Sequence, residues 1–266
     1  MSVGLKQFLR DLLPKKYQVA IKYWNDWLRG TLEEEMKLLE LIVRRNDSVV
    51  DVGGNRGTYS YQLWRLGARV EVFEPNPVCS NILSAWAVGK SAVHVHNVAL
   101  SKCSGNANLH IPIDGSGIEH DASASIESTG FLHARDQMVS LQTLDSFQFE
   151  NVRLIKIDVE GHEFSVIEGA ERTITLSWPV LLVEIEQRHL NGPISVVFDK
   201  ILAHGYCGFF MVGGKLITLE KFEVARHQPM ENFGGSKSGY INNFLFLHQE
   251  RLANGEYISL FKAPLK

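Results

Sequence analysis

The sequence predicts one α/β domain of the Rossmann-like kind, in which a mostly parallel sheet is flanked by helices. Three observations support this prediction. From Ser48 onward, short β-branched or apolar runs alternate with helical stretches, as in a parallel sheet with helices on both faces. The first of these runs ends in a glycine-rich turn. A chain of 266 residues that is 45% hydrophobic can also bury a proper core.

Residues 1–45 precede this pattern and form a helical N-terminal extension in our interpretation, with the Rossmann-like domain over residues 46–266. Apolar residues recur at helical spacing from Leu5 to Leu13 before Pro14 interrupts them. Further helices are expected over residues 19–28 and 31–44. Such amphipathic helices can also lie on a membrane surface or dimerise, but ordinary packing is the favoured interpretation.

Seven strands are expected in the main sheet. Five are parallel, and two C-terminal segments add an antiparallel pair, the first of them bent or turned at Gly213 and Gly214. The segments are 48–52, 69–74, 92–98, 153–158, 180–185, 208–218 and 240–248. Between the third and fourth lies a long polar stretch, residues 101–137, which lacks periodicity and is expected to be a functional loop or lid.

Charge and cysteine content restrict the function. The formal net charge is −3, whereas a protein that neutralises many phosphates needs a basic surplus, so nucleic acid is not expected as a partner. Cys79, Cys103 and Cys207 are widely spaced, which argues against a zinc or disulfide framework and favours the reducing cytoplasm. No signal-peptide pattern and no apolar run of ~18 residues is seen, so we expect a soluble protein.

The most informative segment is residues 48–57, where a buried strand ends in the glycine-rich turn that opens a helix. Gly53, Gly54 and Gly57 allow positive φ and a close approach of the backbone to a ligand. A dinucleotide-binding turn needs glycines at positions i, i+2 and i+5, but Asn55 follows Gly53 at the second of these. The spacing therefore disfavours a nicotinamide cofactor.

Glu74 stands at the end of the second predicted strand, 17 residues after Gly57, a separation that suits one helix and one strand. An acidic side chain at this strand end can accept hydrogen bonds from both hydroxyls of a ribose. Glu71 is less suited, because side-chain alternation places it mid-strand on the opposite face.

The fourth predicted strand leads into a dense charged loop, Leu154-Ile-Lys-Ile-Asp-Val-Glu-Gly-His-Glu163. This stretch resembles the I-K-I-D-V-E-G-x-E motif of the FkbM-family methyltransferases. The D-x-G-x-x-x-G turn from Asp51 and the late Asn243-Phe-Leu-Phe agree with the same family, and the resemblance spans about residues 48–248. It implies a class I methyltransferase fold, S-adenosyl-L-methionine as the methyl donor, and O-methylation of a sugar or natural-product scaffold.

The resemblance also implies roles for individual residues. The turn would line the methionine moiety of the donor, Glu74 would hold the ribose, and Asn97 and Ala99 would lie near the adenine. Arg56 stands where the family commonly has an aliphatic residue, so its role is open. The expected cofactor contacts are Asp51, Gly53, Gly54, Asn55, Gly57, Tyr59, Glu74, Pro75, Asn97, Ala99 and Asp158.

The acceptor proton needs a base, because a sugar or alkyl hydroxyl is a poor nucleophile until its proton is accepted. Our candidates are Asp158, Glu160 and His162 in the loop after the fourth strand. His162 is chemically the easiest base near neutral pH, although the family often has another residue there. A divalent metal held by Asp158, Glu160 and Glu184 is a less favoured alternative, and no metal site is predicted.

The predicted function is therefore O-methylation of a small-molecule or glycan acceptor. N-methylation, an NAD-dependent oxidoreductase and a non-catalytic methyltransferase-like partner protein are the alternatives. The acceptor, the methylated hydroxyl and the oligomeric state are not apparent from the residues, and a homo-oligomer is compatible with them.

Overall fold

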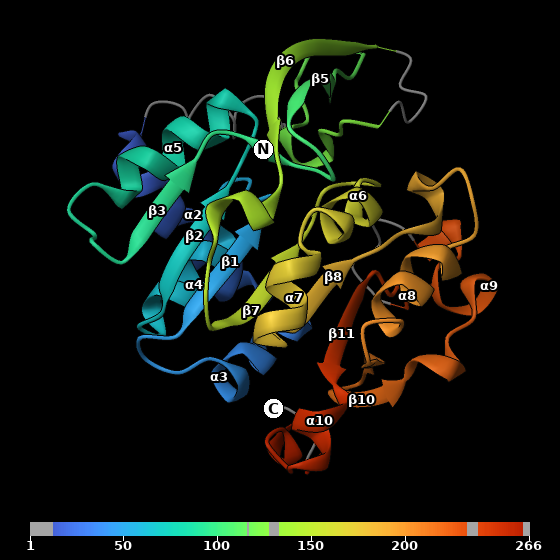
Figure 1. Cartoon of the computed structure of the whole chain (residues 1–266). Helices are drawn as coiled ribbons and strands as arrows, with labels where there is room; N and C mark the ends of the chain where they lie inside the picture. The colour runs from blue at the N-terminus through green and yellow to red at the C-terminus, as the bar shows by residue number, and fades with distance from the viewer. Residues whose placement is uncertain (1–12, 116, 128–132, 233–238, 263–266) are drawn as a thin grey trace.

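The computed structural model describes residues 13–115, 117–127, 133–232 and 239–262. Its largest unit is an eight-stranded sheet in the order β10-β9-β11-β8-β7-β1-β2-β3 (Figure 1). The strands are β1 Ser48–Val52, β2 Arg69–Phe73, β3 Val93–His96, β7 Val152–Ile157, β8 Val180–Glu184, β9 Tyr206–Val212, β10 Lys215–Thr218 and β11 Asn243–His248.

The five expected parallel strands are all present, each within two residues of its predicted bounds. The first strand, β1, lies in the middle of the sheet. β2 and β3 follow it on one side, and β7 and β8, later in the chain, lie on the other side. The strand order thus reverses between β1 and β7. In open α/β sheets, ligands bind outside the carboxyl ends of the strands at such a reversal.

The C-terminal part of the sheet has three strands instead of the two predicted. β9 and β10 pair in an antiparallel manner around Gly213 and Gly214, whose φ angles are 56° and 74°. Two successive residues with positive φ make the tight turn of a β-hairpin, so the predicted bent strand is a hairpin and the sheet has eight strands. β11 lies between β8 and β9, antiparallel to both.

The polar stretch over residues 101–137, expected to be a loop, instead contributes to a second sheet. β4 Ala99–Leu100, β5 Gly105–Pro112 and β6 Ala134–Gln142 form it in the order β4-β6-β5, and β5 and β6 stand at the top of Figure 1, beyond the main sheet. We call residues 99–142 the insertion. Its own fully buried apolar cluster has four members, Ala99, Leu109, Ile111 and Val139. Because so few side chains are apolar, backbone pairing defines these strands, and a hydrophobic pattern could not predict them.

Two cores lie on opposite faces of the main sheet. Neighbouring residues of a strand point to opposite faces, so Val49 belongs to one core and Val50 to the other. Helices α2, α4 and α5 contribute to the first core, and α6, α7 and α8 to the second. The α-helices are α2 Lys15–Arg29, α3 Leu39–Ile42, α4 Thr58–Arg65, α5 Pro77–Ala87, α6 Glu163–Glu168, α7 Glu171–Ser177, α8 Ser195–Leu202, α9 Val224–His227 and α10 Gln249–Ala253.

We call residues 13–45 the N-terminal segment. It packs against the main sheet through α2, whose Val19 and Tyr23 are buried in the first core. This helix was expected over residues 19–28. The helix expected from Leu5 lies outside the described residues, except for Leu13 at its end. None of the helices within the described ranges is long and apolar enough to cross a membrane.

Residues 31–44 were predicted as one helix, and they form two short ones. A 3-10 helix covers Glu34–Leu38 and is followed by the single turn of α3. Thr31 does not cap this segment, because its hydroxyl donates back to the carbonyl oxygen of Asp26 at 3.3 Å. Glu33 directly precedes the 3-10 helix, and its side chain reaches the site described below.

Candidate active site

The turn after β1 is fixed by close packing of its glycines. The N–H groups of Gly53 and Gly54 both donate to the carbonyl oxygen of Phe73, at 2.9 and 3.1 Å. A Cβ atom on Gly53 would lie 1.8 Å from the carbonyl oxygen of Asp158, and one on Gly54 would lie 2.3 Å from Val72 Cγ1. These glycines are thus required by neighbouring protein atoms, whereas the sequence suggested close approach to a ligand.

Glu74 is buried at the end of β2, and its carboxylate holds the glycine turn. One oxygen accepts the N–H of Asn55 at 2.6 Å, and the other accepts the N–H of Asn76 at 2.7 Å. Burial raises the pKa of Glu74 to about 7, although these two hydrogen bonds oppose the rise. Each oxygen keeps a second lone pair, so Glu74 can accept further hydrogen bonds from a ligand.

Glu71, the alternative on the same strand, is engaged elsewhere. Its two oxygens lie 2.7 Å from His94 Nδ1 and 2.7 Å from His96 Nε2. The histidines and Glu71 thus form a bridge between β2 and β3, away from the glycine turn.

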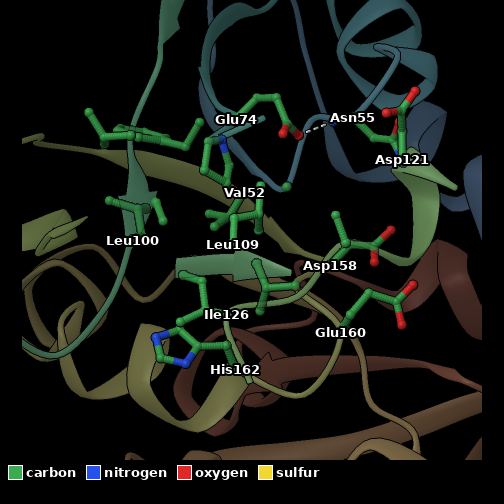
Figure 2. A pocket seen from close by; sticks show the side chains of 17 residues that line it. Val52, Asn55, Glu74, Leu100, Leu109, Asp121, Ile126, Asp158, Glu160 and His162 are labelled. Carbon is green, nitrogen blue, oxygen red and sulfur yellow. Dashed lines mark hydrogen bonds between the residues drawn. The ribbon is translucent and has the colours of Figure 1, made fainter. Parts of the chain in front are cut away.

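A narrow pocket of about 50 Å³ lies beside Glu74, between the glycine turn and the insertion. Figure 2 shows Leu100, Leu109 and Ile126 around it together with Val52 and Glu74. Much of its wall is apolar. Its lining is Val52, Gly53, Asn55, Phe73, Glu74, Pro75, Val98, Ala99, Leu100, Leu109, Asp121, Ala124, Ile126, Asp158, Val159, Glu160 and His162.

A wide cavity of about 460 Å³ adjoins the narrow pocket but has a different character. The residues that line both are Gly53, Asn55, Asp121, Asp158 and Glu160. None of the described residues that line the cavity is aliphatic. It contains seven carboxyl groups and three side chains that are cationic at neutral pH. Its lining is Lys22, Glu33, Asp51, Gly53, Gly54, Asn55, Arg56, Thr58, Tyr59, Glu119, His120, Asp121, Lys156, Asp158, Glu160 and Glu184.

The three predicted bases have different surroundings. His162 is buried and both of its ring nitrogens are engaged, Nδ1 at 2.7 Å from Glu127 Oε1 and Nε2 at 2.9 Å from Ser101 Oγ. In Figure 2 the carboxylates of Asp158 and Glu160 point to the same side of the site, away from the ring of His162. Of the three candidate bases, Asp158 and Glu160 line both the pocket and the cavity, whereas His162 lines the pocket alone.

Asp158 begins the loop after β7, and its N–H donates to the carbonyl oxygen of Val52 at 3.0 Å. The backbone of Asp158 is therefore fixed beside β1, while its side chain keeps 29% of its surface exposed. Burial raises the pKa of Asp158 to about 7. The nearby Lys156 ammonium lowers that pKa, and the Glu160 carboxylate raises it further.

Glu160 occupies a left-handed turn, with φ of 52°, and its Oε2 lies 2.7 Å from His189 Nε2. Among the described residues, the group with metal-ligand spacing is Glu160, Glu186 and His189, so neither Asp158 nor Glu184 of the alternative metal set belongs to it. Arg188 donates to both oxygens of Glu186, at 2.7 and 2.9 Å. A guanidinium group thus already supplies positive charge to this cluster.

Lys156 is a central residue of the site to which the sequence gave no role. It lies near the end of β7 with a fully buried side chain, and its Nζ is 3.8 Å from Asp158 Oδ2 and 4.0 Å from Glu184 Oε2. Asn243 Oδ1 accepts a hydrogen bond from Nζ at 3.0 Å. A lysine between Ile155 and Ile157, near the end of a largely apolar strand, is a sequence signal that could have indicated this position.

Two further wall residues come from segments far away in the sequence. Glu33, from the N-terminal segment, accepts hydrogen bonds from the hydroxyl of Tyr59 and from Asn243 Nδ2. Asp121, from the insertion, pairs with Arg56 and accepts a hydrogen bond from Asn76 Nδ2 at 3.1 Å. Arg56, whose role was open, thus ties the glycine turn to the insertion. No local pattern identifies such partners.

The remaining expected contacts line the pocket, the cavity or neither, and Gly57 lines neither. Pro75 and Ala99 line the narrow pocket, whereas Asp51 and Tyr59 line the wide cavity. Neither lining includes Asn97, which is exposed and donates to the carbonyl oxygens of Glu74 and Pro75 at 2.9 and 3.0 Å. Asn97 therefore fixes the loop after β2.

The positive-φ turn at Gly57 opens α4 and leads to a second buried carboxyl group. Gly57, with φ of 81°, precedes α4 directly. Ser60, on the first turn of that helix, donates its hydroxyl proton to Asp51 Oδ2. Burial raises the pKa of Asp51, and this hydrogen bond opposes the rise.

The sheet order, the glycine turn after β1 and the acidic residue at the end of β2 together define the fold of class I methyltransferases. The chain belongs to the FkbM methyltransferase family, because the model of the methyltransferase FkbM domain matches residues 51–209. This match confirms the family resemblance seen in the sequence and disfavours the nicotinamide-dependent alternative.

Individual relatives are distant. The chain is 24% identical over 222 residues to the 2-O-methyltransferase NoeI of Sinorhizobium fredii (strain NBRC 101917 / NGR234), covering 76% of this chain and 90% of NoeI. It is similar to the solved methyltransferase FkbM from Methylobacillus flagellatus KT, with a TM-score of 0.49 and 18% identity over 90% of this chain. It spans only 57% of that protein. The O-methyltransferase from Bacillus cereus in complex with SAH gives a TM-score of 0.44 and 15% identity, covering 91% of this chain and 96% of that one.

Proposed function

We propose that this protein transfers a methyl group from S-adenosyl-L-methionine to a hydroxyl oxygen of a sugar or glycan. Family membership supports methyl transfer, and the name of the distant relative NoeI specifies 2-O-methylation. The observation that favours a sugar is the wide cavity, whose described lining has many hydrogen-bond acceptors and no aliphatic side chain.

The chemistry of the narrow pocket's lining suits the nucleoside part of the donor, and the pocket of about 50 Å³ would have to widen to admit it. Apolar side chains such as Phe73, Leu100 and Ile126 suit a flat purine ring, and the free lone pairs of Glu74 suit ribose hydroxyls. Asp51 and the glycine turn would then face the methionine part. When bound, the donor supplies a methyl group already activated on a sulfonium. The protein's main task is therefore to orient the acceptor hydroxyl and to accept its proton.

We assign proton acceptance to Asp158. Its carboxylate lines both the pocket and the cavity, where donor and acceptor would meet. A base works best when its pKa lies near the working pH, and burial brings the pKa of Asp158 to about 7. His162 already contacts Glu127 and Ser101 through its two ring nitrogens, and Glu160 contacts His189.

The test is an acceptor screen with donor labelled in its methyl group. Monosaccharides and oligosaccharides are compared with phenols, apolar alcohols and amines, and the labelled product is identified by mass spectrometry and NMR. We expect a methyl ether on a sugar hydroxyl. Methylation of nitrogen, or turnover only with apolar acceptors, would contradict the proposal, and calorimetry with the donor alone tests its donor half separately.

We also propose a reducing compartment, such as the cytoplasm, for this reaction. Cys79, Cys103 and Cys207, all within the described residues, form no disulfide, and Cys103 and Cys207 are exposed. Exposed free thiols persist where thiols are kept reduced. Localisation of a tagged full-length chain tests this proposal.

A further inference from the structure

Lys156 is a buried cation at the base of the wide cavity. It stands beside Asp51 of β1 in the parallel register, and its neighbours Ile155 and Ile157 point to the opposite core. Its side chain has no exposed surface, and its Nζ lies 4.9 Å from the centre of the Tyr59 ring. The ammonium is thus enclosed by protein on the side of the sheet that carries the cavity.

Carboxylates approach this cation from several elements. Asp158 and Glu184, which follow or end β7 and β8, lie 3.8 and 4.0 Å from Nζ. Burial by itself would lower the pKa of Lys156, but the surrounding carboxylates outweigh burial and raise it. The titratable groups that face or influence this centre are Glu33, Glu35, Asp51, Tyr59, Asp158, Glu160 and Glu184.

Fold stability alone does not explain such a residue. A well-packed apolar side chain of similar length often stabilises a buried position as well as an ion pair does, because burying charges costs solvation free energy. Without a cation, neighbouring buried carboxyl groups hold protons at neutral pH, since like charges disfavour ionisation. A carboxyl group that keeps its proton cannot accept another.

We propose that Lys156 is a positioning residue, whose ammonium favours the ionised form of Asp158 and directs its carboxylate at the acceptor cavity. This inference rests on the proposed function, because it assigns Asp158 the acceptor proton. Lys156 keeps its own proton throughout and forms no covalent bond. The hydroxyl proton passes to Asp158 and from there to water, while Lys156 balances the negative charge before each turnover.

The test compares K156M, which removes the charge, with K156R, which keeps it, and with K200M as the matched control. Lys200 pairs with Glu171 at the surface, outside both the pocket and the cavity. Carbon-13 NMR follows the titration of the Asp158 carboxyl group in each folded variant, without any acceptor. In K156M we expect the pKa of Asp158 to rise by about 1 to 3, whereas K156R and K200M leave it near the wild-type value.

Activity provides the second measurement, with an acceptor from the sugar screen. The acidic limb of the pH profile of K156M should move upward by the same amount. Because Asp158 is half ionised at pH 7 in the wild type, turnover at pH 7 should fall about 5- to 500-fold and recover at higher pH. A merely structural role would lower activity equally at all pH values. That result, or an unmoved Asp158 titration in folded K156M, would overturn the proposal.

Two further outcomes, a K156M variant that does not fold and a wild type that methylates no sugar, lead to different conclusions. If K156M does not fold, nitrogen-15 NMR of the wild-type Lys156 decides, because the proposal requires an ammonium that stays protonated to about pH 9. A neutral amine at pH 7 would refute it. If the wild type methylates no sugar, the proposed function fails, while the carboxyl titration, which needs no acceptor, still decides the role of Lys156.

Discussion

The narrow pocket and the wide cavity share Asp158 and Glu160, yet they differ in chemistry and in origin. The pocket has largely apolar walls and four acidic residues, of which Glu74, at the end of β2, lines the pocket alone and the other three also line the cavity. The cavity is lined by seven carboxyl groups, with Lys156 at its base.

The pocket and the cavity are lined partly by different segments of the chain. This difference indicates which segments bear on donor binding and which on acceptor binding. The glycine turn and Glu74 come directly from the parallel strands, whereas the insertion supplies the facing wall of the pocket, including Leu100, Leu109 and Ile126. Several walls of the cavity come from outside the main sheet, namely Lys22 and Glu33 from the N-terminal segment and residues 119–121 from the insertion. The N-terminal segment contributes to the cavity and not to the pocket, so in our proposal it is the segment that bears on acceptor choice alone.

The strongest way to separate the two regions is the substitution Asp158→Asn. It removes the proposed base while keeping the shape of the side chain, so turnover should fall about 10²- to 10⁴-fold. The dissociation constant of the donor, measured by calorimetry, should change far less. Asp136→Asn, at an exposed position of the insertion, is the control. Normal turnover of the Asp158 variant would assign the proton to another group.

The substitution Glu74→Gln should instead weaken binding of the donor. Loss of a charged acceptor costs about 1.5 to 3 kcal/mol per hydrogen bond, so donor affinity should weaken about 10- to 150-fold. Glu71→Gln, on the same strand but facing His94 and His96, is the matched control. If both variants bind the donor as the wild type does, Glu74 does not hold the ribose.

The pH dependence sharpens the comparison without any substitution. Asp158 accepts a proton only when it is ionised, and burial raises its pKa to about 7. The active fraction therefore falls as the pH drops through this value. We expect kcat/KM to decline about tenfold per pH unit below pH 7 and to level off above it. A flat profile between pH 5 and 7 would be inconsistent with a base of this kind.

The smallest expected effect concerns the contact that joins the two regions. Arg56→Leu removes the pair with Asp121, whose side chains are each 11% exposed. A pair of this kind contributes about 1 kcal/mol, so donor affinity should weaken about fivefold. Amide hydrogen exchange should also become faster over residues 117–127. Arg172→Leu, at an exposed helix position, serves as the control. Unchanged exchange in the Arg56 variant would show that Arg56 does not hold the insertion against the glycine turn.

The sequence alone determined the parallel half of the sheet, the turn at Gly53 and the position of Glu74. These features are local, because apolar strand patterns, glycine spacing and strand-end acids are set by neighbours a few residues apart. The family followed from the same motifs. The charged loop after β7 was also recognised, although its three candidate bases could not be ranked.

Only the tertiary structure decided the rest. The antiparallel ribbon of the insertion depends on backbone pairing that leaves little hydrophobic pattern, and the split of residues 208–218 into β9 and β10 depends on two successive positive φ angles. The engagement of His162 by Ser101 and Glu127, and the carboxylates around Lys156, join residues that are far apart in the chain. Burial and pairing of charges are properties of three-dimensional neighbours, and a linear pattern does not contain them.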